Sequence, residues 1–516
     1  MSILESLPCP QSPWLAWMGI PLELLQAIFL HPYFQINYPK ATRWYRLLVI
    51  PICVYLALAT VPRRTFLPTD EYIHFNFGFV TMPTFHFICL SIIYGFHQGP
   101  VFKSEVELFD QDSEDQVEGH AGKPEGEEPA QQGDDYKKSE VKHSSSDVRS
   151  RKCKSKPRSK FVNNTTGEKH NEIAPADQTS TAQTTSRKVS LEKPPSIGEL
   201  TRWISALIMN PRGLICTWSP PENVVPIQRN LNFRKFMMNL ILRTVIMHFW
   251  FQFVCALGVE IVINSNADVD HFLFERLGLT PWRIAKFYTP FFLTVVLGGG
   301  AYSGFALAGG LFNIVEISTI SFLRLILPAN SSFRPEPVNP SNYPALFNDP
   351  WFRTSLTEFW GKGWQAVFRL HFLFCGAQPM YKIFHRYGPT VGKLAAVMGA
   401  MGLSAAMHEF CLVAVSKIDP TFASFRMFLG QGIGIALEAI FKQVTGQKVS
   451  GPLGWAWTFG YMILNGRPMV DAWIQRSLGR GVVPFKQWGL MHFLVPFGPL
   501  ITDEVYVYLM SWVKIF

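Results

Sequence analysis

Apolar segments of bilayer-spanning length recur along most of this chain and restrict it to one class of fold. An α-helix rises 1.5 Å per residue, so about 20 apolar residues cross the hydrocarbon core of a bilayer. Only 16% of the residues are charged, against about 25% in soluble proteins. We therefore predict an all-α, polytopic bundle of about eight to ten transmembrane helices with interfacial amphipathic helices. The candidate segments are 14–30, 45–61, 75–96, 236–263, 284–308, 311–327, 394–415, 422–441, 453–464 and 488–513.

A charged insert divides the chain into three regions. Residues 1–102 carry the N-terminal transmembrane helices, and residues 196–516 carry the second group. Residues 103–195 are rich in Glu, Asp, Lys, Ser and Gln and bury too little apolar surface to offset their ordering entropy, so we expect disorder. An acidic block at 105–135 and a basic block at 149–160 indicate a solvated, cytosolic linker. The alternative is that the basic block binds an anionic leaflet.

The pattern at the N-terminus indicates how the chain enters the membrane. The first apolar segment lacks a basic flank and a small-residue cleavage site, so no cleavable signal peptide is visible. The positive-inside rule favours a lumenal N-terminus, although Arg63 and Arg64 then also lie on the lumenal side. We expect an integral multi-pass protein of the endoplasmic reticulum. The oligomeric state is left open, and we predict the lipid bilayer, rather than nucleic acid, as a partner.

Several stretches outside the spans indicate structure at the membrane surface. Residues 196–203 predict a short amphipathic helix, and 210–213 predict a turn. Residues 328–350 form a loop rich in proline and asparagine. Residues 355–371 mix charged and aromatic side chains, which is typical of an interfacial amphipathic helix.

The glycine runs and the cysteines do not indicate a cofactor. The runs at 298–300, 309–310 and 430–434 lie inside apolar segments and follow no strand, so they favour close helix packing over a nucleotide loop. The eight cysteines have neither paired nor metal-ligand spacing. We predict no disulfide framework, no metal site and no bound cofactor.

His408 and Glu409 form an ionisable pair inside the apolar segment 394–415. A charge near the bilayer centre costs roughly 2.5 to 3.5 kcal/mol, so such a pair is a candidate functional site. Ser404 lies four residues before His408 on the same helical face, whereas Glu409 points about 100° away. Glu409 is therefore expected to hold a neighbouring helix or an arginine. The structural alternative is that both side chains only connect helices.

Two motifs resemble those of a known family. The run SLTEFWGKGW at 355–364 is similar to the SL-x-x-FWGRRW signature of wax-synthase-like enzymes, a branch of the membrane-bound O-acyltransferases. SAAMHE at 404–409 matches the S-x-x-x-H-E motif of that family. NPRG at 210–213, followed by Trp218, also resembles a family segment. Two positions depart from the pattern, because Gly363 replaces the usual arginine and Gln365 replaces the usual asparagine or histidine.

The resemblance implies transfer of an acyl group from a coenzyme A thioester to a hydroxyl. His408 would be the general base, Gln365 and the Trp364 indole would be oxyanion donors, and Glu409 would support the helices around His408. Trp360, Trp364 and Ser404 would contact the substrate. Lys362, Arg369 and Arg353 would bind the phosphates of coenzyme A, although anchoring at the membrane surface is the alternative for each of them.

The substrates follow from the branch of the family. Resemblance to its fungal members, which acetylate secondary metabolites, implies acetyl-CoA as co-substrate and an apolar terpenoid or meroterpenoid alcohol as acceptor. The apolar walls of a membrane-embedded cavity would suit such an alcohol. They would also accept a fatty alcohol, so a wax ester synthase is the first alternative. A proton-coupled transporter with His408 and Glu409 as relay is the second, and the absence of a visible inverted repeat argues against it.

Overall fold

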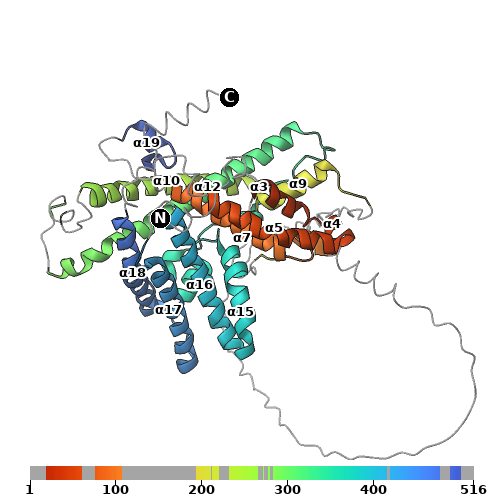
Figure 1. Ribbon diagram of the computed structural model, residues 1–516. Coiled ribbons are helices and arrows are strands. Elements are labelled where there is room, and N and C mark those ends of the chain that lie inside the picture. The colour runs from red at the N-terminus through yellow and green to blue at the C-terminus, as the bar shows by residue number, and fades with distance from the viewer. Residues whose placement is uncertain are drawn as a thin grey trace, which may run out of the picture. The chain divides into compact units, whose positions relative to one another are not determined.

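The computed structural model describes residues 19–60, 76–106, 193–210, 212–219, 232–264, 271, 277–278, 283–414, 419–476 and 488–500. This part of the chain is all-α, as predicted (Figure 1), and its strand-like pairing is limited to an isolated bridge between Phe102 and Cys216. Residues 1–112 and 191–516 belong to one compact unit. Most of the predicted disordered insert lies outside the described residues, so its disorder stays a prediction.

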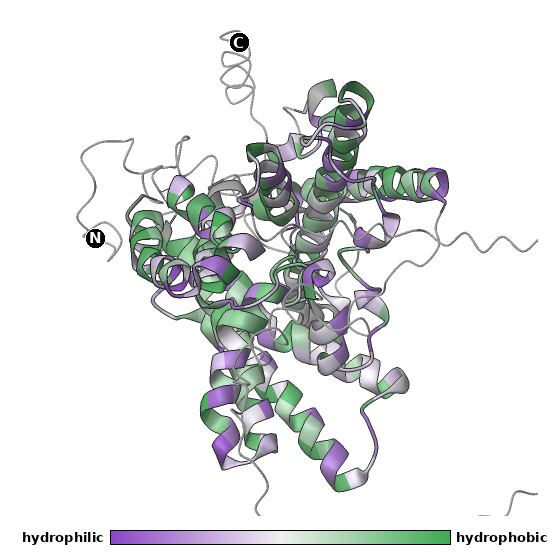
Figure 2. Ribbon diagram, turned by 90° about the vertical axis from the view of Figure 1, so that its right-hand side faces the viewer, coloured by the Kyte–Doolittle hydropathy of each residue, from purple (hydrophilic) through white to green (hydrophobic). Residues whose placement is uncertain are grey.

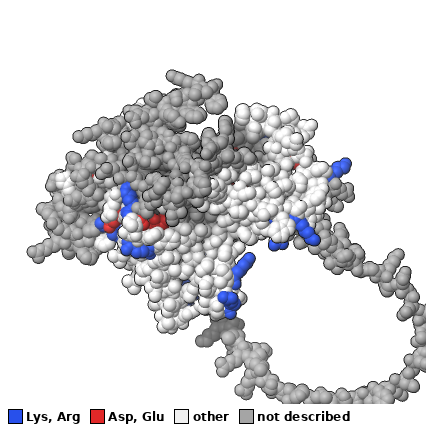
Figure 3. Space-filling model, viewed as in Figure 1, with Lys and Arg blue, Asp and Glu red and all other residues white. Residues whose placement is uncertain are grey.

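Four helices in the described part are long and apolar enough to cross a membrane, over Pro39–Ala59, Phe233–Val262, Phe291–Ile326 and Pro389–Val413. They belong to α5 (Pro39–Thr60), α10 (Phe233–Gly258) with the π-helical turn that follows it, α12 (Arg283–Ile326) and α16 (Pro389–Ala414). The helices are green along much of their length in Figure 2, and most of the described surface in Figure 3 carries no charge. The protein is therefore a polytopic helical membrane protein.

The other predicted spans have different outcomes. Residues 422–441 and 453–464 lie in α17 (Ala423–Thr445) and α18 (Gly451–Gln475), which are 23 and 25 residues long. Both helices are long enough to span, but they are not among the four helices of the described part that are also apolar enough. The shorter apolar helices are α3 (Gly19–Ile28) and α7 (Met82–Phe96). In the last segment only α19 (Leu490–Leu494) and a short turn after it are described.

Two sequence predictions were wrong. The segments 284–308 and 311–327 form one continuous helix, α12, of 44 residues. Gly309 and Gly310 do not break this helix. They leave room for neighbouring side chains instead: a Cβ at Gly310 would meet Thr244 of α10, and one at Gly309 would meet Leu346. Residues 355–371 do not form one amphipathic helix but are broken into α13 (Leu356–Glu358), the π-turn η8 (Phe359–Gly363), a non-helical stretch and α14 (Arg369–His371).

α10 and α12 pack along each other in antiparallel directions. Gly300 of α12 faces Val254, Gly304 faces Phe251 and Gly310 faces Thr244, so the contact partners run backwards along α10. This confirms the prediction that the glycine runs serve close helix packing.

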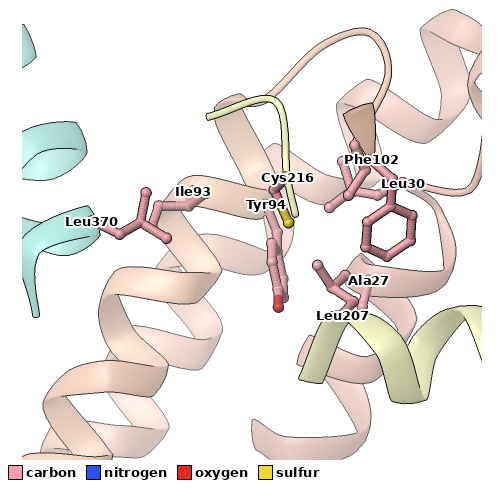
Figure 4. Packing of buried hydrophobic residues seen from close by; sticks show 9 residues of the cluster. Ala27, Leu30, Ile93, Tyr94, Phe102, Leu207, Cys216 and Leu370 are labelled. Atoms are coloured by element: carbon pink, nitrogen blue, oxygen red, sulfur yellow. The ribbon is translucent and has the colours of Figure 1, made fainter. Parts of the chain in front are cut away.

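The N-terminal helices α3, α5 and α7 pack on one another, and α3 also packs on α9 (Ile197–Ile208). Ser196 caps α9 with a capping box, so the predicted amphipathic helix is present and extends to Ile208. The buried cluster of Figure 4 joins these helices to distant segments, with Leu30, Tyr94, Leu207, Cys216 and Leu370 in contact. Arg46 lies in α5 rather than in a loop, is 2% exposed, and donates to the carbonyls of Tyr94 and His97.

α16 packs against α17, α15 (Gln378–Phe384) and the π-turn η9 (Phe372–Ala377), and these elements lie together in the lower part of Figure 1. The approach to η9 is close because Gly376 and Gly399 face each other. A Cβ on either glycine would meet the backbone of the other. The first motif is thereby brought beside the helix that carries the second.

Candidate active site

His408 lies on α16 in the wall of a cavity of about 1190 Å³. Its Nδ1 is 2.7 Å from the backbone carbonyl of Ser404, one turn earlier. A carbonyl oxygen can only accept, so the neutral imidazole carries its proton on Nδ1 and presents the lone pair of Nε2. The ring is held between Phe428 and Trp473, with centroids 4.5 and 5.8 Å away. The arrangement fixes one tautomer and one ring orientation.

Ser404 therefore holds His408 through its backbone carbonyl. Ser404 is buried and lines the same cavity. Any residue with a helical backbone at this position would supply the carbonyl.

Gln365 lies on the same cavity and uses one end of its amide to shape the chain. Its Oε1 accepts hydrogen bonds from the N–H groups of Val367 and Phe368, at 2.8 and 3.3 Å. The side chain thus caps the turn that leads into α14. This contact fixes the orientation of the amide, so its two Nε2–H groups are available to another acceptor.

Trp360 and Trp364 both line the cavity, and an aromatic cluster orients them. The Trp360 indole donates to Gln431 Oε1 at 3.1 Å, so its N–H is already used. Trp364 stacks on Phe359 with ring centroids 5.4 Å apart. The backbone N–H of Trp364 donates to the Phe359 carbonyl at 2.7 Å, and this hydrogen bond closes the π-turn. Of these two indoles, Trp364 is the one that could donate to a substrate oxygen.

Glu409 points away from the cavity toward the start of α17. Its Oε1 accepts from the N–H of Ser424 at 3.2 Å. Nearby, Asp419 accepts from Thr421, Ala423 and the Arg476 guanidinium, which lies 2.6 Å away. This carboxylate-rich corner connects the ends of α16, α17 and α18, so Glu409 supports the helices rather than the reaction centre.

The three residues predicted to bind coenzyme A occupy different positions relative to the cavity. Arg369 lines the cavity and donates to the Trp364 carbonyl, and burial lowers the pKa of its guanidinium. Lys362 is exposed in η8, beside Gly361 of the cavity wall. Arg353 donates through Nε and Nη2 to the Asn348 carbonyl, at 3.0 and 2.6 Å, and orders the loop before the motif. Within the described residues, Arg369 is thus the only one of the three in the cavity wall.

Sequence reasoning missed Glu438, which holds the first motif in place. Its Oε1 accepts from the Leu356 N–H at 2.6 Å and the Trp457 indole at 3.0 Å. Its Oε2 accepts from the N–H and hydroxyl of Thr357. Glu438 is an ionisable residue inside an apolar segment, the same signal that singled out His408, and it was available in the sequence.

A second cavity, of about 2050 Å³, adjoins the first. The two share Gly78, Met82, Phe305, Ala308 and Phe497 in their walls. Arg212 of the 210–213 turn borders the second cavity and donates to the carbonyls of Pro344 and Ala345. The site is therefore a pair of adjoining chambers with His408 in the wall of the smaller one. In the described part of the chain, no group of His, Cys, Asp and Glu side chains could hold a metal ion.

The segment that carries both motifs matches a known protein family. Residues 343–430 match the model of the membrane bound O-acyl transferase family. The chain is 28% identical over 102 residues to acyl-CoA–sterol O-acyltransferase 1 of Arabidopsis thaliana, which is 20% of this chain and 30% of the relative. It is 27% identical over 123 residues to a long-chain-alcohol O-fatty-acyltransferase of Simmondsia chinensis, 23% of this chain and 35% of the relative.

A third relative is a probable long-chain-alcohol O-fatty-acyltransferase 8 of Arabidopsis thaliana, 28% identical over 141 residues, 25% of this chain and 39% of the relative. The chain thus spans between 30% and 39% of the length of these relatives. These matches support the resemblance to wax-synthase-like membrane-bound O-acyltransferases. The narrower placement in a fungal branch stays a prediction.

Proposed function

We propose that this protein is an acyl-CoA-dependent O-acyltransferase of the membrane, with His408 as general base. The observation that carries the proposal is the 2.7 Å contact between His408 Nδ1 and the Ser404 carbonyl, in the wall of an apolar cavity. It makes Nε2 the proton acceptor. A base that is held in one tautomer inside a water-poor chamber suits the activation of an alcohol and protects the thioester from hydrolysis.

The reaction would run in two steps. The acceptor hydroxyl gives its proton to His408 Nε2 as its oxygen attacks the thioester carbonyl, forming a tetrahedral intermediate. That intermediate collapses to the ester and expels the thiolate of coenzyme A, which takes the proton back from the imidazolium. The side chain of His408 is unchanged at the end of the cycle.

The oxyanion of the intermediate needs donors that are in place beforehand. Gln365 Nε2 is suited to this role because Oε1 is fixed by the N–H groups of Val367 and Phe368. The Trp364 indole is a second candidate from the same wall. Arg369, a desolvated cation in this wall, would favour the phosphates of coenzyme A, with Lys362 outside as a further contact.

For the substrates, we propose acetyl-CoA as donor and an apolar terpenoid or meroterpenoid alcohol as acceptor, with membranes of the endoplasmic reticulum as the location. The two chambers are large enough for a polycyclic alcohol, since ligand pockets commonly measure roughly 300–1,000 Å³. The names of the relatives favour a second candidate, transfer of a long acyl chain to a fatty alcohol or sterol.

The test uses membranes that contain the protein, its His408→Ala variant, or the His385→Ala control, in which an exposed histidine outside both chambers is removed. Each is incubated with labelled acetyl-CoA or palmitoyl-CoA and a panel of terpenoid alcohols, sterols and fatty alcohols. Ester formation by the parent and the control, and not by His408→Ala, is expected. Label from palmitoyl-CoA alone would select the second candidate. Activity that survives in His408→Ala would overturn the assignment of the base.

A further inference from the structure

Glu316 is an ionisable residue on the membrane-spanning part of α12, and it lines the larger chamber. Its Oε1 accepts a hydrogen bond from the Tyr343 hydroxyl at 3.0 Å. The second carboxylate oxygen has no hydrogen-bond donor among the described residues. A carboxylate at membrane depth is costly and usually has a partner or a function. Neither the reaction nor the packing described above uses this one.

The chamber around Glu316 suits an apolar molecule that enters from the bilayer. Part of its wall is made of large apolar side chains that are exposed in the structure, among them Leu242, Ile246 and Phe312. Water-soluble molecules gain nothing from such a rim, whereas a lipid-soluble alcohol can pass along it. A hydrogen-bonding group in the largely apolar wall of such a chamber then helps to select the orientation of the molecule.

The position of Glu316 relative to His408 sets the length of the molecule. Ala308 is the last residue on α12 that borders both chambers, and Glu316 lies eight residues beyond it. At 1.5 Å per residue this separation is about 12 Å along the helix. A molecule that reaches from the smaller chamber to Glu316 would have to span a distance of about this order.

We propose that the larger chamber is the acceptor site, and that Glu316, oriented by Tyr343, binds a second hydroxyl at the far end of the acceptor. The acceptor is then a long or polycyclic apolar diol, with one hydroxyl esterified at His408 and the other donating to Glu316. Tyr343 fixes one carboxylate oxygen and leaves the other for the ligand. This proposal rests on the proposed function and adds the class of its acceptor.

The test compares acceptors that differ only at the remote end. Hexadecane-1,16-diol carries a remote donor, 16-methoxyhexadecan-1-ol carries an acceptor only, and 1-hexadecanol carries neither. The parent protein is expected to prefer the diol by about tenfold in kcat/KM, beyond its twofold statistical advantage, because a hydrogen bond to a charged group is lost in the other two. Glu316→Leu should remove the preference, and Tyr343→Phe should weaken it.

Asp471→Asn is the matched control, since it removes a carboxylate outside both chambers. Each ratio is measured within one variant, so a lower amount of folded protein does not affect it. Equal use of the three alcohols by the parent, or a preference unchanged in Glu316→Leu, would overturn the acceptor proposal and leave acyl transfer intact. Failure of the parent to acylate any of these alcohols, or any terpenoid alcohol, sterol or fatty alcohol of the panel above, would instead overturn the proposed function.

Discussion

The carboxylate of Glu438 on α17 accepts the backbone N–H of Leu356 at 2.6 Å, although 82 residues separate them. The same carboxylate also accepts from Thr357 and from the Trp457 indole. One buried side chain therefore fixes the start of the first motif to two helices of the bundle. The placement of Trp360, Trp364 and Gln365 in the chamber depends on this anchor.

Replacing Glu438 with Ala should destabilise the protein and reduce its activity. The substitution leaves the N–H groups of Leu356 and Thr357 and the indole of Trp457 without their acceptor, and each unsatisfied buried donor costs roughly 1–3 kcal/mol. Thermal inactivation of the detergent-solubilised protein measures the effect. Glu358→Gln, on the exposed face of α13, is the control and should behave like the parent. Equal stability of the two variants would contradict the anchoring role.

The way in which Ser404 holds His408 predicts contrasting effects of two substitutions. Ser404→Ala keeps the carbonyl that accepts from Nδ1, so it should change kcat by less than about threefold. His408→Gln removes the base and should lower kcat by roughly 10²–10⁴-fold. Both are measured with the alcohol that the parent uses best. A large loss in Ser404→Ala would mean that its hydroxyl, rather than its backbone, takes part.

The oxygen and the nitrogen of the Gln365 amide can be tested separately by two substitutions. Gln365→Glu keeps the oxygen that accepts from Val367 and Phe368 but removes the N–H donors, so the fold should be retained while kcat falls by roughly 10²–10³-fold. Gln365→Ala removes both ends and should lower thermal stability as well. If Gln365→Glu retains the activity of the parent, the oxyanion donor must be sought elsewhere, with Trp364 as the next candidate.

The sequence could predict those parts of the site that depend on local geometry. The spacing of Ser404 and His408 places them one helical turn apart, and the 100° step to Glu409 explains why that side chain contacts Ser424 instead. The all-α class followed from the apolar segments. These features depend on helix periodicity alone, which is visible in any single sequence.

Features that depend on tertiary packing could not be predicted. The 355–371 stretch contains residues typical of a helix, but the stacking of Phe359 on Trp364 favours a π-turn, and Gln365 then caps a new start. The sequence prediction divided 284–308 from 311–327 at Gly309 and Gly310, yet glycine costs a helix only about 1 kcal/mol, and Gly310 leaves room for Thr244 of α10. Glu438 could be singled out as an ionisable residue in an apolar segment, but its contacts with Leu356 and Thr357 could not be predicted because these partners are distant in sequence.

The contact between α16 and η9 predicts a position-dependent effect of a single methyl group. Gly399→Ala should destabilise the protein by roughly 1–3 kcal/mol, because the new Cβ would overlap the backbone of Gly376 and rigid backbone cannot move aside cheaply. Gly402→Ala on the same helix meets only Leu429, at an ordinary 3.9 Å, and should be neutral or slightly stabilising. Melting curves of the two variants measure this difference in stability. Similar curves would place η9 farther from α16 than the structure has it.

The buried Asp419–Arg476 pair predicts a pH-dependent difference in stability. Burial alone would raise the pKa of Asp419, but hydrogen bonds from Ala423 and Thr421 together with the Arg476 charge lower it overall. An unfolded Asp titrates at about 3.9, so ionised Asp419 stabilises the fold above that pH, and the contribution is lost as the pH falls through the lower folded pKa.

Asp419→Asn should therefore have a lower melting temperature than the parent at pH 7. The difference in melting temperature should shrink below about pH 4, because the parent carboxylate becomes neutral as well. Asp471→Asn breaks the more exposed pair with Arg467, whose side chains are 38% and 24% exposed, and should cost only about 0–1 kcal/mol at any pH. A difference for Asp419→Asn that stays constant from pH 7 to pH 3 would show that hydrogen-bond geometry, and not charge, holds this corner of α16, α17 and α18 together.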